Sequence, residues 1–463
     1  MLRLIFFLVL SCLLAWAAVW VVDHPGTVQV RWLEQELVLS VGTVIVGLLV
    51  IGALAIVLFE LLRVVVGLPG NWRVGRRRRH EVRGLEELNR GLMAAAAGDL
   101  AAARTHHRQA ERHLPENGAL LLLQAQTAQL EGKEEIAHLK FRQMLDRRDA
   151  EFVGLRGLLA QAMKTGDHDE ALTLARRAYR RSPTTPWVLT TLLELLGRAG
   201  KWEEALPLID EMQAQKLLSE AEARHKKAVL LHMTATGLVA QDRQSDALSQ
   251  ARRAAKLAPA FAPGVVQAAE LALQAGKRRQ AVQVLEDAWK VEPHPDVARA
   301  YAQIDPAETA SQRLKRIDSR LAPLQRDNLE TLVLQAEVAM QAGEWDTART
   351  RLEAALNASP TARVYRLLAE LERQSRGNQA KAQEWLARAT DAPPDRAWVC
   401  DDTGEVLPSW RPVAPSGRFD AVHWASPPKV ATLLGTEQTT YILAHDDAPS
   451  YGSSGAAQAA AAS

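Results

Sequence analysis

Three neighbouring histidines are the first residues whose types and spacing could do chemistry. His106 and His113 are seven residues apart, so on an α-helix they share one face, with His107 beside them. Imidazole is a common axial ligand of haem iron, so this face could hold a haem. The simpler interpretation is that all three are polar surface residues, and it is the one we favour.

A second candidate site lies near the C-terminus, where aromatic and turn residues follow one another closely. The layout resembles a rubredoxin-type or zinc-ribbon knuckle, in which two C-x-x-C pairs bind one metal ion. Here Cys400 occupies the first cysteine position of the first pair, but Thr403 occupies the second. The second pair falls at residues 413–416, which contain no cysteine. His423 or Asp401 could add a ligand. One thiolate cannot complete a tetrahedral thiolate site, so we predict no metal.

The common catalytic motifs are missing from the sequence. It contains no dinucleotide-binding or phosphate-binding glycine loop, no H-E-x-x-H helix and no G-x-S-x-G elbow. Cys12 and Cys400 are too few and too distant for a disulfide framework, which fits a reducing compartment. We interpret Trp187, Trp289 and Trp385 as helix-packing residues rather than a platform for bases. We therefore predict no catalytic residue, no cofactor and no enzyme.

The composition predicts an all-α fold. Of the 463 residues 48% are hydrophobic but only 5% are aromatic, and alanine and leucine dominate. This balance favours helices that pack through small side chains over a β-rich fold. The net charge of +2 gives no indication of a nucleic-acid partner.

A regular repeat is the strongest signal in the sequence. Ala103, Ala137, Ala171 and Ala205 follow one another at one constant interval. That interval is about 34 residues, the period of the tetratricopeptide repeat, which is a helix–turn–helix unit. The alternative, alanines spaced by chance, does not explain why neighbouring positions keep the same phase. After a longer step the series continues with Ala247 and Ala281, and after nearly two periods with Ala348 and Ala382.

Three positions recur in most repeats, and each has a physical role, although the repeats at Ala137 and Ala205 lack the proline. A glycine five residues before the alanine makes the turn between helices, and a second alanine seven residues after it lets the partner helix approach. A proline twelve residues after it ends the second helix. Trp202 and Trp345 fill the groove between helices, and Asp242 replaces one glycine. The remaining members are Gly98, Gly132, Gly166, Gly200, Gly276, Gly343 and Gly377; Ala110, Ala178, Ala254, Ala288, Ala355 and Ala389; and Pro115, Pro183, Pro259, Pro293, Pro360 and Pro394.

The repeats predict a tetratricopeptide-type α-solenoid over residues 84–396, with about eight recognisable units. The longer step before Ala247 inserts about two helical turns near Gln215–Arg224, and the gap before Ala348 holds a degenerate helical pair near 296–326. A small irregular cap at 397–430 should close the last hydrophobic face, and the low-complexity tail 445–463 should be disordered. We expect the groove of the solenoid to bind other proteins.

Two apolar runs near the N-terminus predict two transmembrane helices within residues 1–66. Ile5–Val22 has 18 residues without a charge and Val38–Phe59 has 22, enough to cross a hydrocarbon core about 30 Å thick. Ala15–Ala17 resembles a signal-peptide cleavage site, which leaves open whether the first run is removed.

Charge predicts the orientation of these helices. The short loop 23–37 is not basic and alternates in a way that favours a small periplasmic β-hairpin, with Trp32 near the headgroups. The linker 67–83 is strongly basic, so it and the repeat domain should lie on the cytoplasmic side of a bacterial inner membrane. A nucleic-acid patch is the less favoured alternative. The run consists of Arg76, Arg77, Arg78 and Arg79.

The N-terminal part resembles the HemY family of proteobacterial inner-membrane proteins. The residues that carry the resemblance are, in order, Asp23–Val28, Trp32, Leu68–Pro69, the run Arg76–Arg79, Asn89–Leu92 and Ala97–Asp99. The resemblance implies a multi-pass membrane protein that takes part in a late step of haem synthesis or in porphyrin handling, with haem-biosynthesis enzymes as partners. A flavin-dependent protoporphyrinogen oxidase shares the family name, but this chain has no flavin-binding turn.

Two other hypotheses remain. The chain is also similar to a single-span tetratricopeptide adaptor that controls lipopolysaccharide assembly, although that family has an intact rubredoxin knuckle and no second span. A haem- or metal-dependent enzyme is the third possibility.

Overall fold

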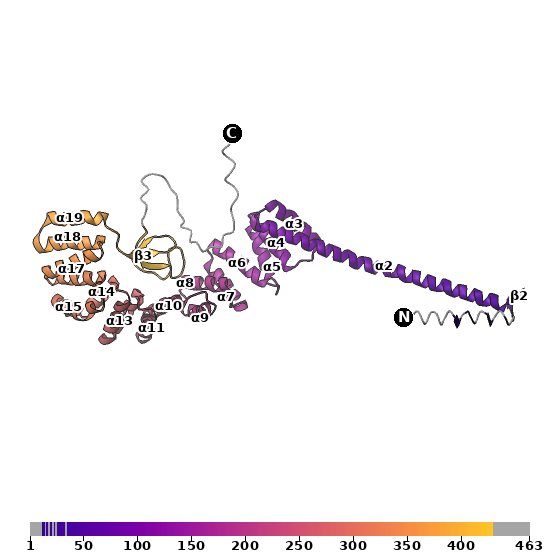
Figure 1. Cartoon of the computed structure of the whole chain (residues 1–463), viewed down its shortest axis with the longest axis horizontal. Helices are drawn as coiled ribbons and strands as arrows, with labels where there is room; N and C mark the ends of the chain where they lie inside the picture. Colours follow the sequence, from indigo (N-terminus) through magenta and orange to yellow (C-terminus); the bar gives the residue numbers. More distant parts are fainter. Residues whose placement is uncertain are drawn as a thin grey trace, which may run out of the picture. The chain divides into compact units, whose positions relative to one another are not determined.

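The computed structural model describes residues 12–13, 15–16, 19–20, 23, 26–32 and 35–428. Most of the run Ile5–Val22 and all of the tail 445–463 lie outside these residues. The chain divides into two compact units, Met1–Ala150 and Glu151–Ser463. Figure 1 shows both units.

The first unit begins with the predicted β-hairpin. Strands β1 (Thr27–Trp32) and β2 (Gln35–Ser40) are antiparallel, with Val30 opposite Leu37. Ser40 ends the second strand and its Oγ accepts a hydrogen bond from the N–H of Thr43 at 3.3 Å, which caps the following helix. The apolar run that was expected to be helical from Val38 therefore starts as strand. The helix itself begins at Val41.

Helix α2 (Val41–Ala96) is continuous over 56 residues. Its first part, Val41–Leu62, is long and apolar enough to cross a membrane, and it is the one such segment among the described residues. Residues 67–83, expected as a linker, lie inside this helix. Arginine is a good helix former, so a basic run does not interrupt a helix. The end of α2 is also the first helix of the first repeat.

The remainder of the first unit consists of α3 (Leu100–His113), α4 (Gly118–Leu130) and α5 (Glu134–Met144). Asp99 caps α3 and Asn117 caps α4, each through its side-chain oxygen. Leu88 of α2 packs with Leu114, Leu120 and other residues in a small buried cluster.

The second unit is built from stacked helix pairs. Even-numbered helices contact one another from α10 to α18, and α11 contacts α13, so the unit has two layers. Its helices are α6 (Glu151–Thr165), α7 (His168–Arg181), α8 (Pro186–Arg198), α9 (Trp202–Ala214), α10 (Glu220–Ala240), α11 (Gln244–Leu257), α12 (Ala262–Gln274), α13 (Arg278–Val291), α14 (Pro295–Ala302), α15 (Ala310–Arg316), α16 (Leu329–Gln341), α17 (Trp345–Ala358), α18 (Ala362–Arg376) and α19 (Gln379–Asp391).

Both irregular steps of the repeat have a structural counterpart. Helix α10 has 21 residues whereas α8 and α12 have 13 each, so the insertion lengthens α10 at its N-terminal end. The degenerate pair consists of the short helices α14 and α15. A π-turn at Ile317–Leu321 and a 3₁₀ turn at Ala322–Leu324 follow α15.

The turn without glycine gives a stability prediction. Asp242 adopts the same left-handed conformation as the turn glycines, with φ 59° against 69° for Gly276. A Cβ atom is unfavourable there, so Asp242→Gly should stabilise the unit by about 0.5–1 kcal/mol. The reverse change, Gly276→Ala, should cost about 1 kcal/mol, because an added Cβ meets no atom within 4 Å and only the backbone is strained. Thermal unfolding of both variants measures these shifts, and a destabilised Asp242→Gly would contradict the prediction.

An ion pair between α17 and α18 should make stability depend on pH. Arg349 Nη1 lies 2.6 Å from Glu372 Oε1, and the Glu372 side chain is 1% exposed. The hydrogen bond from Arg349 holds the pKa of Glu372 below its ordinary value of 4.5 in spite of burial. The stabilisation is therefore complete above pH 4.5 and is lost as the pH falls through the lower folded-state pKa.

Glu372→Gln tests this pH dependence. We expect the difference in melting temperature between the wild type and this variant to shrink as the pH is lowered from 7 to below 4.5. Glu353→Gln, on an exposed position of α17, is the control. A difference that stays constant over this range would contradict the assignment.

The C-terminal cap is a small sheet rather than an irregular segment. Strands β3 (Ala397–Cys400), β4 (Val406–Leu407) and β5 (Val422–Ala425) are antiparallel in the order β4-β3-β5. The cap does not close the last hydrophobic face next to α19 as expected. It folds back to helices much earlier in the chain, where Arg198 Nε donates to the carbonyl of Gly417 at 2.9 Å. The cap lies there because Phe419 packs against Gly197 of α8 and Asp420 pairs with residues of α10.

Candidate functional site

The cap is anchored on α8 and α9 by one aromatic side chain. Phe419 is 6% exposed and lies against Gly197, where an added Cβ would come within 3.2 Å of its ring. The rings of Phe419 and Trp202 are 6.4 Å apart. Gly197 therefore provides the space into which Phe419 inserts.

Next to this anchor, a buried carboxylate joins the cap to α10. Asp420 is buried, with Oδ1 3.2 Å from His225 Nε2 and Oδ2 3.0 Å from Lys226 Nζ. Burial opposes ionisation, but the hydrogen bond from His225 and the charge of Lys226 hold the pKa of Asp420 below its ordinary value. Both partners lie in the first two turns of α10, the part that the insertion adds. The insertion thus supplies the docking site for the cap.

Aromatic contacts continue the interface toward α14. Trp410 lies 5.0 Å from the ring of Phe261, before α12, and 5.4 Å from His232 of α10. His294, at the start of α14, lies 4.4 Å from the ring of Trp424, and burial lowers its pKa to about 4. Through these contacts the cap lies against α8, α10, the start of α12 and the start of α14. Figure 1 shows it on the inner, groove side of the curved array of the second unit.

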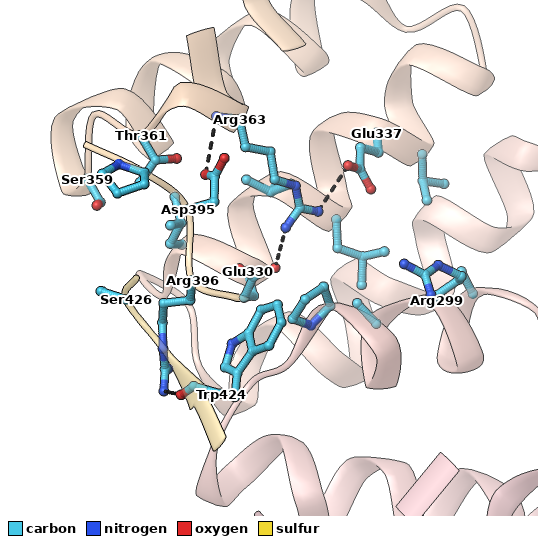
Figure 2. Close-up of a pocket in the computed structure, with 18 of the residues that line it drawn as sticks. Arg299, Glu330, Glu337, Ser359, Thr361, Arg363, Asp395, Arg396, Trp424 and Ser426 are labelled. Carbon is cyan, nitrogen blue, oxygen red and sulfur yellow. Dashed lines mark hydrogen bonds and ion pairs between the residues drawn. The ribbon is translucent and has the colours of Figure 1, made fainter. Parts of the chain in front are cut away.

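Beyond the cap the groove remains open. A cavity of about 720 Å³ lies between α14, α16 and the start of α18, and we call it the open pocket. Its remaining walls are the segment Pro393–Arg396 and Trp424 of the cap, as Figure 2 shows. Arg396 fixes this wall, because its guanidinium donates to the carbonyl of Trp424 at 2.6 Å and contacts Glu292 at 2.9 Å.

Some of the charged residues of the open pocket are paired with one another. Arg363 lies between two carboxylates, 2.8 Å from Glu330 and 3.1 Å from Glu337 (Figure 2). Burial raises the pKa of Glu330 although Arg363 opposes this shift. The backbone N–H of Arg363 donates to Asp395 at 3.2 Å. The hydroxyl of Thr361 is buried and has no hydrogen-bond partner among the described residues.

The lining of the open pocket is mixed, with apolar residues of α16 beside charged residues. Val333, Leu334 and Val338 belong to the lining but are almost fully buried, so charged side chains such as Glu337 and Arg363 supply much of its surface. The lining contains neither histidine nor cysteine, which are the usual general bases and thiol nucleophiles. A mixed surface of this kind can accept an extended polypeptide, with polar groups of the polypeptide at the paired charges.

The predicted repeat residues occupy the places that their roles require. The turn glycines all have positive φ: Gly98, Gly132, Gly166, Gly200, Gly276, Gly343 and Gly377. The predicted repeat alanines that are 0–1% exposed are Ala103, Ala110, Ala137, Ala171, Ala178, Ala205, Ala247, Ala254, Ala281, Ala288, Ala348, Ala355 and Ala382. Ala389 is half-buried. The prolines that follow the ends of helices are Pro115, Pro183, Pro259, Pro293, Pro360 and Pro394.

The candidate haem-binding histidines have separate partners. His106 Nδ1 lies 2.6 Å from Glu87 Oε2, and His113 Nδ1 lies 3.2 Å from His80 Nδ1. All three histidines are on α3, as predicted. The structure does not bring them together as one pair of ligands.

The knuckle of the cap keeps its turns without its ligands. Gly404 and Gly417, which follow Thr403 and Ser416, both have positive φ. Cys400 is fully buried, and it is the one thiol among the four ligand positions of the knuckle, 400, 403, 413 and 416. Instead of a metal ion, Asp402 joins the two turns, because its carboxylate accepts from Ser416 Oγ at 2.5 Å and pairs with Arg418. The residues present do not fit a rubredoxin-type metal site.

No sequence pattern pointed to the docking residues Phe419, Asp420 and His225 or to the pocket residue Arg363. None of them belongs to a repeated position, so periodicity could not reveal them. The longer step before Ala247 was the available signal, because an insertion that breaks a repeat often has a function of its own.

Stacked helix pairs with turn glycines and a shared repeat phase define a helical-repeat protein of the tetratricopeptide type. Residues 26–132 match the family model described as HemY protein N-terminus, which confirms the family resemblance over this part of the chain.

Two curated relatives and one solved structure are similar to this chain. The "Probable magnetosome protein Mms48" of Magnetospirillum gryphiswaldense is 25% identical over 442 residues, which cover 95% of this chain and 97% of the relative. "Cellulose synthase 2 operon protein C" of Komagataeibacter xylinus is 33% identical over 126 residues, 27% of this chain and 10% of that protein. A tetratricopeptide repeat protein from Parabacteroides merdae aligns with 52% of this chain and 98% of its own, with 16% identity and a TM-score of 0.26.

Proposed function

We propose that this chain is a membrane-anchored, non-catalytic scaffold that takes part in a late step of haem synthesis or in porphyrin handling. The open pocket beside the stacked helix pairs is the observation that supports the scaffold part, because it exposes apolar and paired charged residues together. The haem part rests on the match of residues 26–132 to the HemY N-terminal family. Deletion of the gene followed by measurement of porphyrins and haem tests it. Unchanged pools under haem demand would contradict it.

The proposed partner is a protein segment that lies in the open pocket. A photo-crosslinking amino acid at Glu337, which is 36% exposed, should capture that partner in cells. The same group at Arg388, on α19 and outside the pocket lining, is the matched control. Arg363→Glu should abolish capture, because it reverses the charge that faces Glu330. Equal capture from both positions would contradict a groove-specific interaction.

We place the repeat domain on the cytoplasmic side of a bacterial inner membrane, with Arg76, Arg77, Arg78 and Arg79 as the topology signal. The apolar segment Val41–Leu62 supports a membrane anchor. Protease treatment of spheroplasts tests the orientation, because a cytoplasmic repeat domain stays intact until the membrane is opened. The other predicted span, Ile5–Val22 at the start of the chain, is also part of this proposal.

An envelope-assembly adaptor is the second candidate function. It is favoured by the cap, whose paired turns at Gly404 and Gly417 keep the knuckle layout of that adaptor family. Identification of the proteins captured at Glu337 separates the two functions. Terminal haem enzymes would support the first candidate, and cell-envelope enzymes would support the second.

A further inference from the structure

Three potential metal ligands meet where the cap touches α10. They are His225 of α10, Asp420 at the docking turn and His423 of β5, and one ligating atom from each lies within 4.8 Å of the others. Two imidazoles and a carboxylate are the ligand types that zinc and related divalent ions take in proteins. This cluster is separate from the knuckle positions 400, 403, 413 and 416 considered above.

The spacing of two ligands already suits a tetrahedral ion. An ion about 2.0–2.1 Å from each ligand would hold neighbouring ligand atoms roughly 3.3 Å apart, and His225 Nε2 is 3.2 Å from Asp420 Oδ1. His423 is 44% exposed and its ligating atom lies within 4.8 Å of the other two, so a small side-chain shift would bring it to the ion. The rings of His225 and His423 are nearly parallel, with centroids 6.2 Å apart and an interplanar angle of 24°. Water would complete the fourth position.

Neighbouring groups are placed where they could orient the ligands. His423 Nδ1 lies 3.0 Å from Asp401 Oδ2 without hydrogen-bond geometry, so a small rotation of the ring would complete this hydrogen bond and leave Nε2 for the ion. A carboxylate behind a ligating histidine is the usual arrangement at zinc sites. Lys226 binds Oδ2 of Asp420 at 3.0 Å and so leaves Oδ1 for the ion. Its charge opposes a cation and should keep the affinity moderate.

We propose that His225, Asp420 and His423 bind one divalent transition-metal ion, with zinc as the best fit, and that this ion clamps the cap onto α10. The clamp would replace the cross-link that the knuckle has lost. It would also control how firmly the cap covers the groove between α8 and α14.

The test uses the full-length, untagged chain in detergent, with Co²⁺ as the spectroscopic probe and Zn²⁺ as its competitor. We expect one equivalent of Co²⁺ that Zn²⁺ displaces, without the sulfur-to-cobalt charge-transfer absorption that Cys400 would produce. Asp401→Asn should weaken binding about 10–100-fold, and His423→Ala should weaken it further. Zn²⁺ should raise the melting temperature of the wild type and not that of His423→Ala.

Two matched variants make the test decisive. His168→Ala removes an exposed histidine at the start of α7 and should leave binding unchanged, and Cys400→Ser should do the same. Absence of stoichiometric binding, binding that survives His423→Ala, or binding that is lost in Cys400→Ser would each overturn the proposal. Because His423 is exposed, its removal should not unfold the cap, and circular dichroism verifies this.

Discussion

Replacing Trp289 with alanine should lower the free energy of unfolding of the Glu151–Ser463 unit by about 3–5 kcal/mol. Trp289 of α13 is 0% exposed, and its indole N–H donates to the hydroxyl of Thr331 on α16 at 3.2 Å. It therefore connects two regular repeats across the degenerate pair α14–α15. The substitution leaves a cavity that the neighbouring helices cannot fill and removes the hydrogen-bond partner of a buried hydroxyl.

Chemical denaturation of the full chain measures this effect, with Trp385→Ala as the matched control. Trp385 is only partly buried and carries Arg388 over its ring at 4.9 Å, so its removal should cost much less. Trp289→Phe should retain most of the stability, because a buried aromatic ring still fills most of the space. It should lose only the contribution of the hydrogen bond to Thr331. A Trp289→Ala variant no less stable than Trp385→Ala would show that the degenerate pair does not depend on this residue.

Phe419→Ala should release the cap from the groove, with a loss of about 3 kcal/mol. The cap is shorter than the roughly 40 residues that a domain needs to fold alone without a disulfide, metal or partner. An undocked cap should therefore unfold and expose Cys400, which is fully buried when the cap is docked. We expect the alkylation rate of Cys400 to rise by roughly 100-fold, the equivalent of that free-energy loss. The measurement is made with a chelator present and in a Cys12→Ser background.

A second phenylalanine of the same unit provides the control. Phe152 packs against Trp187 at 5.4 Å between ring centroids, outside the cap interface, so Phe152→Ala should leave the reactivity of Cys400 unchanged. Gly197→Val should act like Phe419→Ala, because its side chain would meet Phe419 from the helix side. Unchanged alkylation in both Phe419→Ala and Gly197→Val would mean that this contact does not hold the cap in place.

If the cap behaves in this way, it limits which part of the groove a partner can reach. The docked cap covers the surface between α8 and α14, whereas the open pocket beside Arg363 remains accessible. A variant that releases the cap should enlarge the set of proteins that crosslinking captures. Binding at the open pocket should weaken in such a variant, because unfolding of the cap also removes the wall that Trp424 supplies.

The sequence alone determined the helix pairs, because the features that define them are local. A turn glycine such as Gly276 must adopt positive φ, and alanines seven residues apart, such as Ala281 and Ala288, must lie on one buried face. The hairpin before α2 was also predictable, since alternation over Val28–Trp32 is a property of the strand itself. Residues 67–83 were predicted as a basic linker, but α2 continues through them. Arginine is a good helix former, so the basic run does not end the helix.

Only the tertiary structure decided where the cap lies and which part of the groove is open. The cap is placed by the fit of Phe419 beside Gly197 and by the pairing of Asp420 with His225 and Lys226. The two segments that meet there lie far apart in the sequence. No short-range pattern records such a pairing, because shape and charge complementarity between distant segments exist only after the helices have stacked.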